Sequence, residues 1–197
     1  MQNIVSICGT SRPDNLTARA LAIVNDELEQ LGHKPVFFDA RELELAFPGQ
    51  PSTDDAIRLR AALDDAAGVI LATPEYHGGF SAMTKLIIEN LGFPSELSGK
   101  PVALVGVAAG RIGAIKSLEQ LRGVCSHVGA IVLPKAVSIA GVRGAFNEEG
   151  QCVDDDVERA LRGVAVSLLG FMQDYVIPKL TLEALVRQDA TPWPAEV

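Results

Sequence analysis

Residues that could bind an anion gather in one short segment near the start of the chain. Residues 9–17 read GTSRPDNLT and combine hydroxyl, amide and guanidinium side chains. The segment lies between an apolar run of strand length and a run of helical period, so it ends at a helix N-terminus. Unpaired backbone N–H groups and the helix dipole favour an anion there. We therefore predict a phosphate-binding loop.

Arg12 distinguishes this interpretation from an ordinary helix cap. Asn15 or Thr17 alone would cap the helix without any ligand, but a cation near a helix N-terminus opposes the dipole unless an anion lies between them. The segment contains neither GxxxxGK[ST] nor GxGxxG. It is therefore neither the P-loop nor the dinucleotide fingerprint.

A second segment places an aromatic ring beside paired glycines. Residues 73–81 read TPEYHGGFS. Paired glycines let a flat ligand approach the backbone closely, and Tyr76 offers a stacking or edge contact. The histidines at positions 33, 77 and 127 show no metal-ligand spacing, so a solvent-facing side chain is the simpler interpretation of His77. The segment suits a heteroaromatic ring better than a metal ion.

A third segment, residues 108–113, reads AAGRIG and again joins an apolar run to a helical one. A tight turn would explain its two glycines. Arg111 adds a candidate for a second anion contact.

The elements that must position these segments alternate along the chain. Apolar runs of strand length occupy residues 4–8, 35–38, 69–72, 102–107 and 130–133, and helical spacing of apolar residues occupies 21–31, 56–66, 83–91, 115–128 and 157–175. Strict alternation is typical of βαβ units around a parallel sheet. Five strands favour a flavodoxin-like α/β three-layer sandwich, with a five-stranded parallel sheet in order 2-1-3-4-5 and helices on both faces, over the Rossmann order. The three segments then meet at the carboxyl edge of the sheet, where such folds bind ligands.

Composition narrows the classes of partner. The 197 residues carry 17 Lys and Arg against 25 Asp and Glu, a net charge of -8, which disfavours nucleic acid and anionic lipid. Three scattered cysteines argue against disulfides and zinc, and no apolar run reaches the roughly 20 residues of a membrane span. We expect a single cytoplasmic domain over residues 1–197, with a Pro-bearing tail from about residue 177 and no bound metal.

Together these motifs resemble the NADPH-dependent FMN reductase family of flavodoxin-like proteins. The first segment matches G-[ST]-x-R-x-x-[SN]-x-[ST], the second contains P-E-Y-[NH]-G, and the third precedes a helix that ends in a V-G pair at residues 128–129. The resemblance extends to about the fifth strand. Residues 135–150 and the tail carry no diagnostic motif.

The resemblance implies a noncovalent FMN, reduced by NADPH or NADH, that passes electrons to a small acceptor such as a quinone, azo compound, flavin or metal oxyanion. The cofactor carries the chemistry, so no catalytic side chain is expected. The implied binding residues are Thr10, Ser11, Arg12, Asn15 and Thr17 for the phosphate, Pro74, Glu75, Tyr76, His77 and Gly78 for the ring, and Gly110 and Arg111 at its other edge.

The resemblance also implies a homodimer or homotetramer, for which the helix at residues 83–91 and the tail are candidate contacts. At positions 10, 15 and 77 the family more commonly has Ser, Ser and Asn, where this chain has Thr10, Asn15 and His77. The first two keep polar contacts to phosphate. His77 could alter substrate access or the flavin potential.

Two other functional classes share parts of this pattern. A flavodoxin-type electron carrier without its own NAD(P)H oxidation would have the same fold, but carriers usually sandwich the ring between aromatics and this chain is only 5% aromatic. A non-catalytic phosphate or nucleotide module would explain the first segment and leave the second unexplained. A hydrolase is disfavoured because GxSxG is absent and Cys8 lies in an apolar strand.

Overall fold

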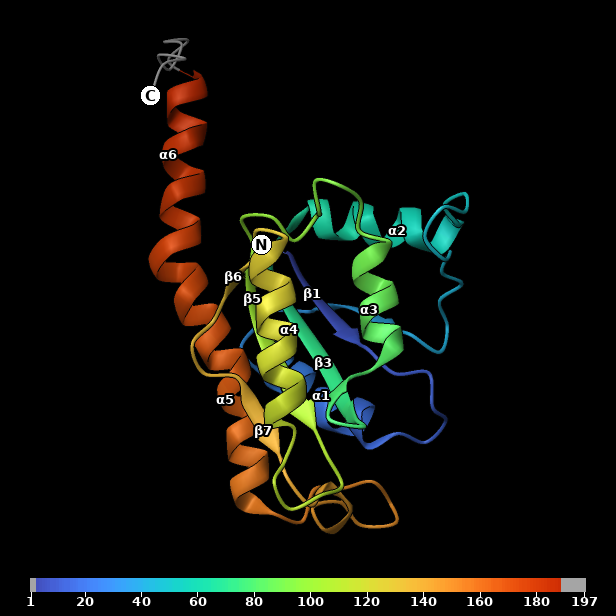
Figure 1. Cartoon of the computed structure of the whole chain (residues 1–197). Coiled ribbons are helices and arrows are strands. Elements are labelled where there is room, and N and C mark those ends of the chain that lie inside the picture. Colours follow the sequence, from blue (N-terminus) through green and yellow to red (C-terminus); the bar gives the residue numbers. More distant parts are fainter. Residues whose placement is uncertain (1–2, 189–197) are drawn as a thin grey trace.

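A parallel sheet forms the centre of the molecule (Figure 1). The computed structural model describes residues 3–188, with side chains through residue 186. The strands are β1 (Asn3–Cys8), β2 (Val36–Asp39), β3 (Ala66–Tyr76), β4 (Gly79–Phe80), β5 (Pro101–Val107), β6 (Ile131–Val132) and β7 (Val137–Ile139). The helices are α1 (Leu16–Gln30), α2 (Asp54–Asp64), α3 (Ala82–Glu89), α4 (Ile115–His127), α5 (Asp155–Phe171) and α6 (Ile177–Gln188), with a 3-10 turn, η1 (Val142–Gly144), and a π-helical segment, η2 (Met172–Val176).

The strand order confirms the flavodoxin-like arrangement. Strands run β2-β1-β3-β5-β6 and are parallel, and β7 also pairs with β5. The predicted count of five strands is corrected to seven. The fifth position is shared by β6 and β7, because Pro134 between them has no N–H to donate to the ladder. The seventh is β4, a short strand antiparallel to β3.

The segment 73–81, expected as a loop, is mostly a β-hairpin. Glu75 pairs with Phe80 and Tyr76 with Gly79. The two turn residues, His77 and Gly78, have φ of 52° and 74°. A two-residue hairpin turn with φ positive at both positions matches the twist of the strands it joins. The aromatic side chain of Tyr76 is therefore presented from a strand end.

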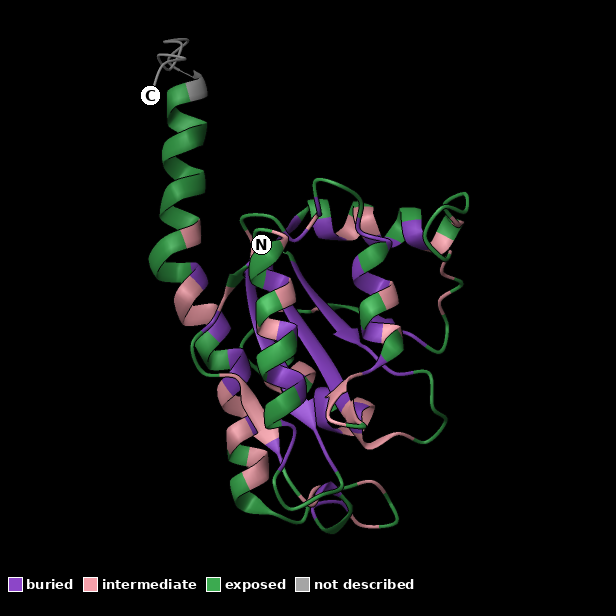
Figure 2. Cartoon of the chain, viewed as in Figure 1, coloured by how far each residue is buried: buried purple, intermediate pink, exposed green. Residues whose placement is uncertain are grey.

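Two apolar layers hold the helices against the sheet. On one face α1 and α5 pack their buried stripes against β1, β3 and β5. On the other face α2, α3 and α4 do the same. Figure 2 shows the central strands almost wholly buried, as expected for a parallel sheet covered on both sides.

The C-terminal part differs from the expected tail. The helix does not stop near residue 177 but continues through η2 into α6, which extends beyond the body in Figure 1. Pro178 cannot donate to a helical ladder. The π-helical segment directly before it shifts the bonding register and accommodates the missing donor. The expected features at Pro192, Trp193 and Pro194 lie outside the described residues.

One continuous helical stretch, Asp155–Val186, is long and apolar enough to cross a membrane by length and composition alone. Core helices of soluble proteins pass the same criterion. Its first half buries Leu161, Val164 and Leu168 against the sheet.

Candidate functional site

Gly9 anchors the loop between β1 and α1. Its N–H donates to the carbonyl of Ala72 at 2.8 Å, and its own carbonyl accepts from the hydroxyls of Ser81 and Thr84. A Cβ at this position would overlap the Thr84 hydroxyl and lie 2.9 Å from the Ala72 carbonyl oxygen. Only glycine therefore lets this loop start so close to β3 and α3.

Asn15 caps helix α1. Its Oδ1 accepts from the Ala18 N–H at 2.7 Å, and its Nδ2 donates to the Arg12 carbonyl at 2.9 Å. The first backbone N–H groups of a helix have no acceptor within the helix, and Asn15 satisfies one of them, that of Ala18. The N–H groups of Leu16 and Thr17 lie in the same first turn and are available to an anion.

Tyr76 links the first loop to the hairpin. Its hydroxyl lies 3.1 Å from Thr10 Oγ1, and the Arg12 guanidinium carbon lies 5.8 Å from its ring centroid. The first contact is a hydrogen bond, and the second is within cation–π range. Arg12 and Tyr76, which are 64 positions apart in the sequence, therefore form one wall.

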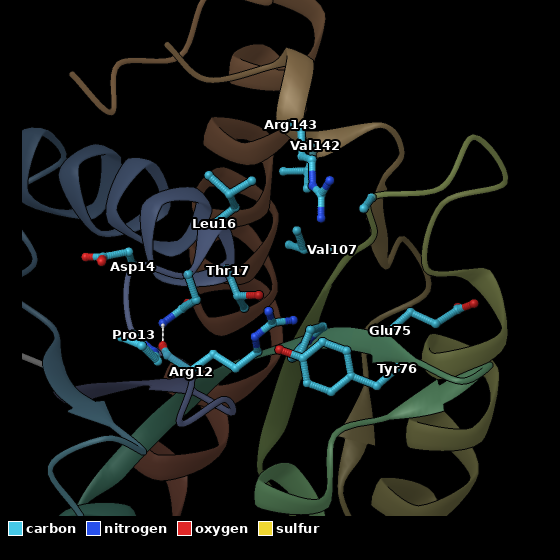
Figure 3. A pocket seen from close by; sticks show the side chains of 13 residues that line it. Arg12, Pro13, Asp14, Leu16, Thr17, Glu75, Tyr76, Val107, Val142 and Arg143 are labelled. Carbon is cyan, nitrogen blue, oxygen red and sulfur yellow. Dashed lines mark hydrogen bonds between the residues drawn. The ribbon is translucent and has the colours of Figure 1, made fainter. Parts of the chain in front are cut away.

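These residues open onto a cleft of about 320 Å³ at the carboxyl edge of the sheet (Figure 3). Small-molecule sites commonly have volumes of roughly 300 to 1,000 Å³. The lining comes from four segments: the first loop, the end of β3, the end of β5 and the turn η1. Its residues are Arg12, Pro13, Asp14, Asn15, Leu16, Thr17, Pro74, Glu75, Tyr76, Val107, Ala109, Val142 and Arg143.

Half of the residues that the sequence singled out line this cleft, namely Arg12, Asn15, Thr17, Pro74, Glu75 and Tyr76. Thr10 is buried behind Tyr76. The others are outside the lining: Ser11, His77 and Arg111 are exposed, the Gly78 carbonyl accepts from Gln120, and the Gly110 carbonyl accepts from Gly113 and Gly141.

Glu75 has a structural partner. Its carboxylate accepts from the backbone N–H of Ser117 at 3.1 Å. The residue before α4, Ala114, makes no side-chain cap, so Glu75 supplies the missing acceptor and favourable charge at this helix N-terminus. Figure 3 shows its carboxylate directed away from Arg12. The contact holds the hairpin against α4.

Sequence reasoning missed the part of the lining that follows β7. Val142 and Arg143 belong to residues 135–150, where no motif is present. The available signal was positional, since the loop after every parallel strand ends at the same edge. The strand that precedes this loop, β7, has only the three residues VSI and follows Pro134, so its apolar run was too short to be recognised as a strand.

Cys8 lies beside the first loop, but its thiol is unreactive. Its thiol donates weakly to Asn15 Oδ1 at 3.7 Å. Burial, together with the nearby Asp39 carboxylate, raises the pKa of Cys8 to about 12. The thiol is therefore protonated at neutral pH and is not a nucleophile. Across residues 3–188, no group of three or more His, Cys, Asp or Glu side chains could hold a metal ion.

Comparison with known proteins identifies the family of this chain. Residues 2–144 match the family model described as NADPH-dependent FMN reductase. The chain belongs to the NADPH-dependent FMN reductase family. The matched span includes all of the segments that line the cleft.

Named relatives agree with the family. The chain is 30% identical to an NADPH azoreductase of Bacillus sp. (strain OY1-2), over 87% of this chain and 93% of the relative. It is 24% identical to a 2-hydroxy-1,4-benzoquinone reductase of Burkholderia sp., over 81% and 90%. The solved structure of FerB, a flavoenzyme NAD(P)H:(acceptor) oxidoreductase from Paracoccus denitrificans, superposes with a TM-score of 0.73 at 20% identity, covering 89% of this chain and 99% of FerB. That similarity shows the shared fold.

Family membership confirms the enzyme class inferred from the motifs: an NAD(P)H-dependent FMN reductase, with FMN as cofactor and NAD(P)H as electron donor. The residues present fit FMN. The open first turn of α1 and the Arg12 side chain suit its phosphate, and the Tyr76 ring suits its flat ring system.

Proposed function

We propose that this reductase passes electrons from NAD(P)H through FMN to small quinone or azo acceptors at the cleft described above. The cleft carries the proposal, because a helix N-terminus, a guanidinium and an aromatic ring meet there at the carboxyl edge of a parallel sheet. The acceptor class is supported by the relatives named for azo and benzoquinone reduction.

Each side chain has a binding task in this proposal. FMN, when bound, supplies the hydride chemistry. Arg12 and the free N–H groups of Leu16 and Thr17 bind its phosphate. Tyr76, held in place by Thr10, lies against the ring.

The remaining assignments follow the family pattern. Ser11 and Asn15 support the phosphate loop. The ring lies against the segment that begins at Pro74, and its polar edge is bonded by the main chain from Glu75 to Gly78, with His77 at the turn. Gly110 and Arg111 border the region where the nicotinamide stacks. Because His77 is exposed at the turn of the hairpin, it is the residue through which acceptor access would differ from that of relatives with Asn.

A flavodoxin-type carrier is the second candidate. One observation weighs against it: Tyr76 is the single aromatic residue among those that line the cleft, so no second ring is present there to cover the other face of the flavin. A face left uncovered suits direct contact with a nicotinamide.

An anaerobic absorbance experiment tests the proposal. FMN is added to the purified protein, the flavin spectrum is recorded, and NADPH or NADH is then added. We expect prompt bleaching, followed by reoxidation when a benzoquinone or an azo dye is introduced. A bound flavin that stays oxidised would favour the carrier, and failure to bind FMN would contradict the site assignment.

The proposal includes a homodimer or homotetramer in the cytoplasm. Apolar side chains on α6 support an assembly, since Leu182 and Leu185 are 63% and 53% exposed. The helix α3 offers less than expected, because its Ile87 and Ile88 are buried in the core of this chain. Light scattering coupled to gel filtration measures the mass of the assembly.

A further inference from the structure

Three arginines stand apart from the others in this chain. Most arginine side chains donate to a carboxylate, a carbonyl or a hydroxyl; these are Arg19, Arg41, Arg58, Arg60, Arg122, Arg159 and Arg162. Among the arginine side chains described through residue 186, only those of Arg12, Arg111 and Arg143 make no hydrogen bond or ion pair. All three belong to segments that follow a parallel strand at the carboxyl edge.

Two of these three, Arg12 and Arg143, line the same cleft. Figure 3 shows their side chains entering it from different sides, with Thr17 on the side formed by α1. Two cations on one small cleft repel each other unless an anion lies between them. Two carboxylates also belong to the lining, but neither pairs with these arginines: Glu75 accepts from the Ser117 N–H, and Figure 3 shows the Asp14 carboxylate directed away from Arg143.

The turn that carries Arg143 is held firmly. Val142 N–H donates to the Ala108 carbonyl at 3.1 Å, and Gly141 N–H donates to the Gly110 carbonyl at 3.0 Å. Val142 and Ala145 on either side are buried. The exposed Arg143 therefore projects from a fixed backbone, which is what precise recognition of a ligand needs.

The same turn adjoins the start of α1. Leu16 and Val142 line the cleft together, and Arg19 donates from α1 to the Asn147 carbonyl at 3.3 Å. Arg143 thus extends from a segment packed beside the helix N-terminus that binds the phosphate in the proposed function.

We propose that Arg143 is a second guanidinium for the FMN phosphate, opposite Arg12. This inference rests on the proposed function. A phosphate monoester carries about -1.5 to -2 charges at neutral pH, and a helix N-terminus contributes only about half a positive charge. Arg12 and the helix N-terminus together supply about 1.5 positive charges, less than the dianion carries, and a second guanidinium more than makes up the difference. Arg143 then makes the pocket select FMN over riboflavin, which lacks the phosphate.

Binding titrations test this assignment independently of turnover. Apoprotein is titrated with FMN and with riboflavin, with flavin fluorescence as the readout, for the wild type and for Arg143→Ala. Because a hydrogen bond to a charged group is strong, we expect the FMN Kd to rise roughly tenfold to a hundredfold. The riboflavin Kd should change by less than about twofold, since the lost contact involves only the phosphate.

Two variants sharpen the result. Arg143→Lys keeps the charge but loses the planar fork, so its FMN Kd should lie between those of the wild type and Arg143→Ala. Arg159→Ala removes an exposed arginine on α5 that pairs with Asp156, and it should leave both affinities unchanged. Circular dichroism melting curves verify that each variant is folded.

The outcomes separate this inference from the proposed function. If wild-type protein binds FMN and is bleached by NADPH but Arg143→Ala keeps the same ratio of FMN to riboflavin affinity, only the Arg143 assignment is overturned. An equal loss of FMN and riboflavin affinity in Arg143→Ala would also overturn it. So would an unaltered FMN affinity combined with a raised KM for NADPH and an unchanged KM for NADH, because Arg143 would then contact the nucleotide. Wild-type protein that binds no FMN would overturn both.

Discussion

The Arg12 side chain lines the cleft beside the first turn of α1 and also lies over the Tyr76 ring. We expect Arg12→Ala to raise the FMN Kd roughly tenfold to a hundredfold with the fold intact, because a charge-assisted bond to the phosphate is lost. Fluorescence titration measures it. Arg58→Ala on α2 is the control: it removes a surface pair with Asp55 and a cation–π contact with Phe38, and Arg58 does not line the cleft. Equal affinities for wild type and Arg12→Ala would remove Arg12 from the site.

The cysteines give a second test at the residue scale. Burial raises the pKa of both Cys8 and Cys125 to about 12, so at pH 8 only about one thiol in ten thousand is ionised. We expect a thiol reagent at pH 8 to modify Cys152, which is half-buried, and to spare the other two until the protein is denatured. Peptide mapping after labelling measures this. Rapid labelling of Cys8 in the native protein would contradict it.

The raised pKa values of Cys8 and Cys125 also make the stability of the fold depend on pH. A thiol whose pKa is higher in the folded state than in the unfolded state favours folding below the unfolded value, near 9, and this contribution disappears as pH rises toward 12. The free energy of unfolding should therefore fall above pH 9. Replacing Cys8 with Ser should reduce that dependence, and denaturant titrations at several pH values compare the two proteins.

At the scale of elements, the site depends on how closely the loop after β1 approaches β3 and α3. Gly9→Ala would force a Cβ into the Thr84 hydroxyl and the Ala72 carbonyl. We expect a loss of about 1 to 3 kcal/mol in the free energy of unfolding, the usual effect of overpacking. FMN affinity should fall with it, because the loop proposed to bind the phosphate starts at Gly9.

Gly123→Ala is the matched control for this change. A Cβ at Gly123, within α4, meets nothing within 4 Å, and alanine is the better helix former. Its free energy of unfolding should stay the same or rise by up to about 1 kcal/mol. If both variants were equally stable, the close approach at Gly9 would not matter to the fold.

Much of the element plan was predictable from local patterns. The apolar runs that became β1, β3 and β5 are fully buried strands, and the helical spacing before and after them marked α1, α4 and α5. The fifth position of the sheet was harder to predict. Pro134 divides it, and a strand as short as β7 depends on its pairing with β5 rather than on its own composition.

At the scale of the whole molecule, α6 is the element with least support from the rest of the chain. It continues from α5 through η2 and extends beyond the body (Figure 1). Its apolar side chains Leu182 and Leu185 are exposed in the single chain, so they gain no packing energy there. An assembly of copies would cover that surface. This supports the proposal that the enzyme is an oligomer.

We therefore expect the double variant Leu182→Glu with Leu185→Glu to lower the mass of the assembly measured by light scattering. Both side chains are exposed in the single chain, so the fold should persist. Ile57→Glu on α2, where the side chain is 51% exposed, provides a control at a different surface. An unchanged mass in the double variant would show that α6 does not hold copies together.

The sequence alone determined the strand order and the placement of the first loop and of Tyr76 at the carboxyl edge of the sheet, because apolar periodicity, glycines and caps are local properties of neighbouring residues. Only the tertiary structure decided that Glu75 caps α4, that Thr10 supports Tyr76, and that Arg143 enters the cleft. Each of these contacts joins residues from different βα units. They arise from the register of the strands and the packing of helices across the sheet, and no local pattern specifies them.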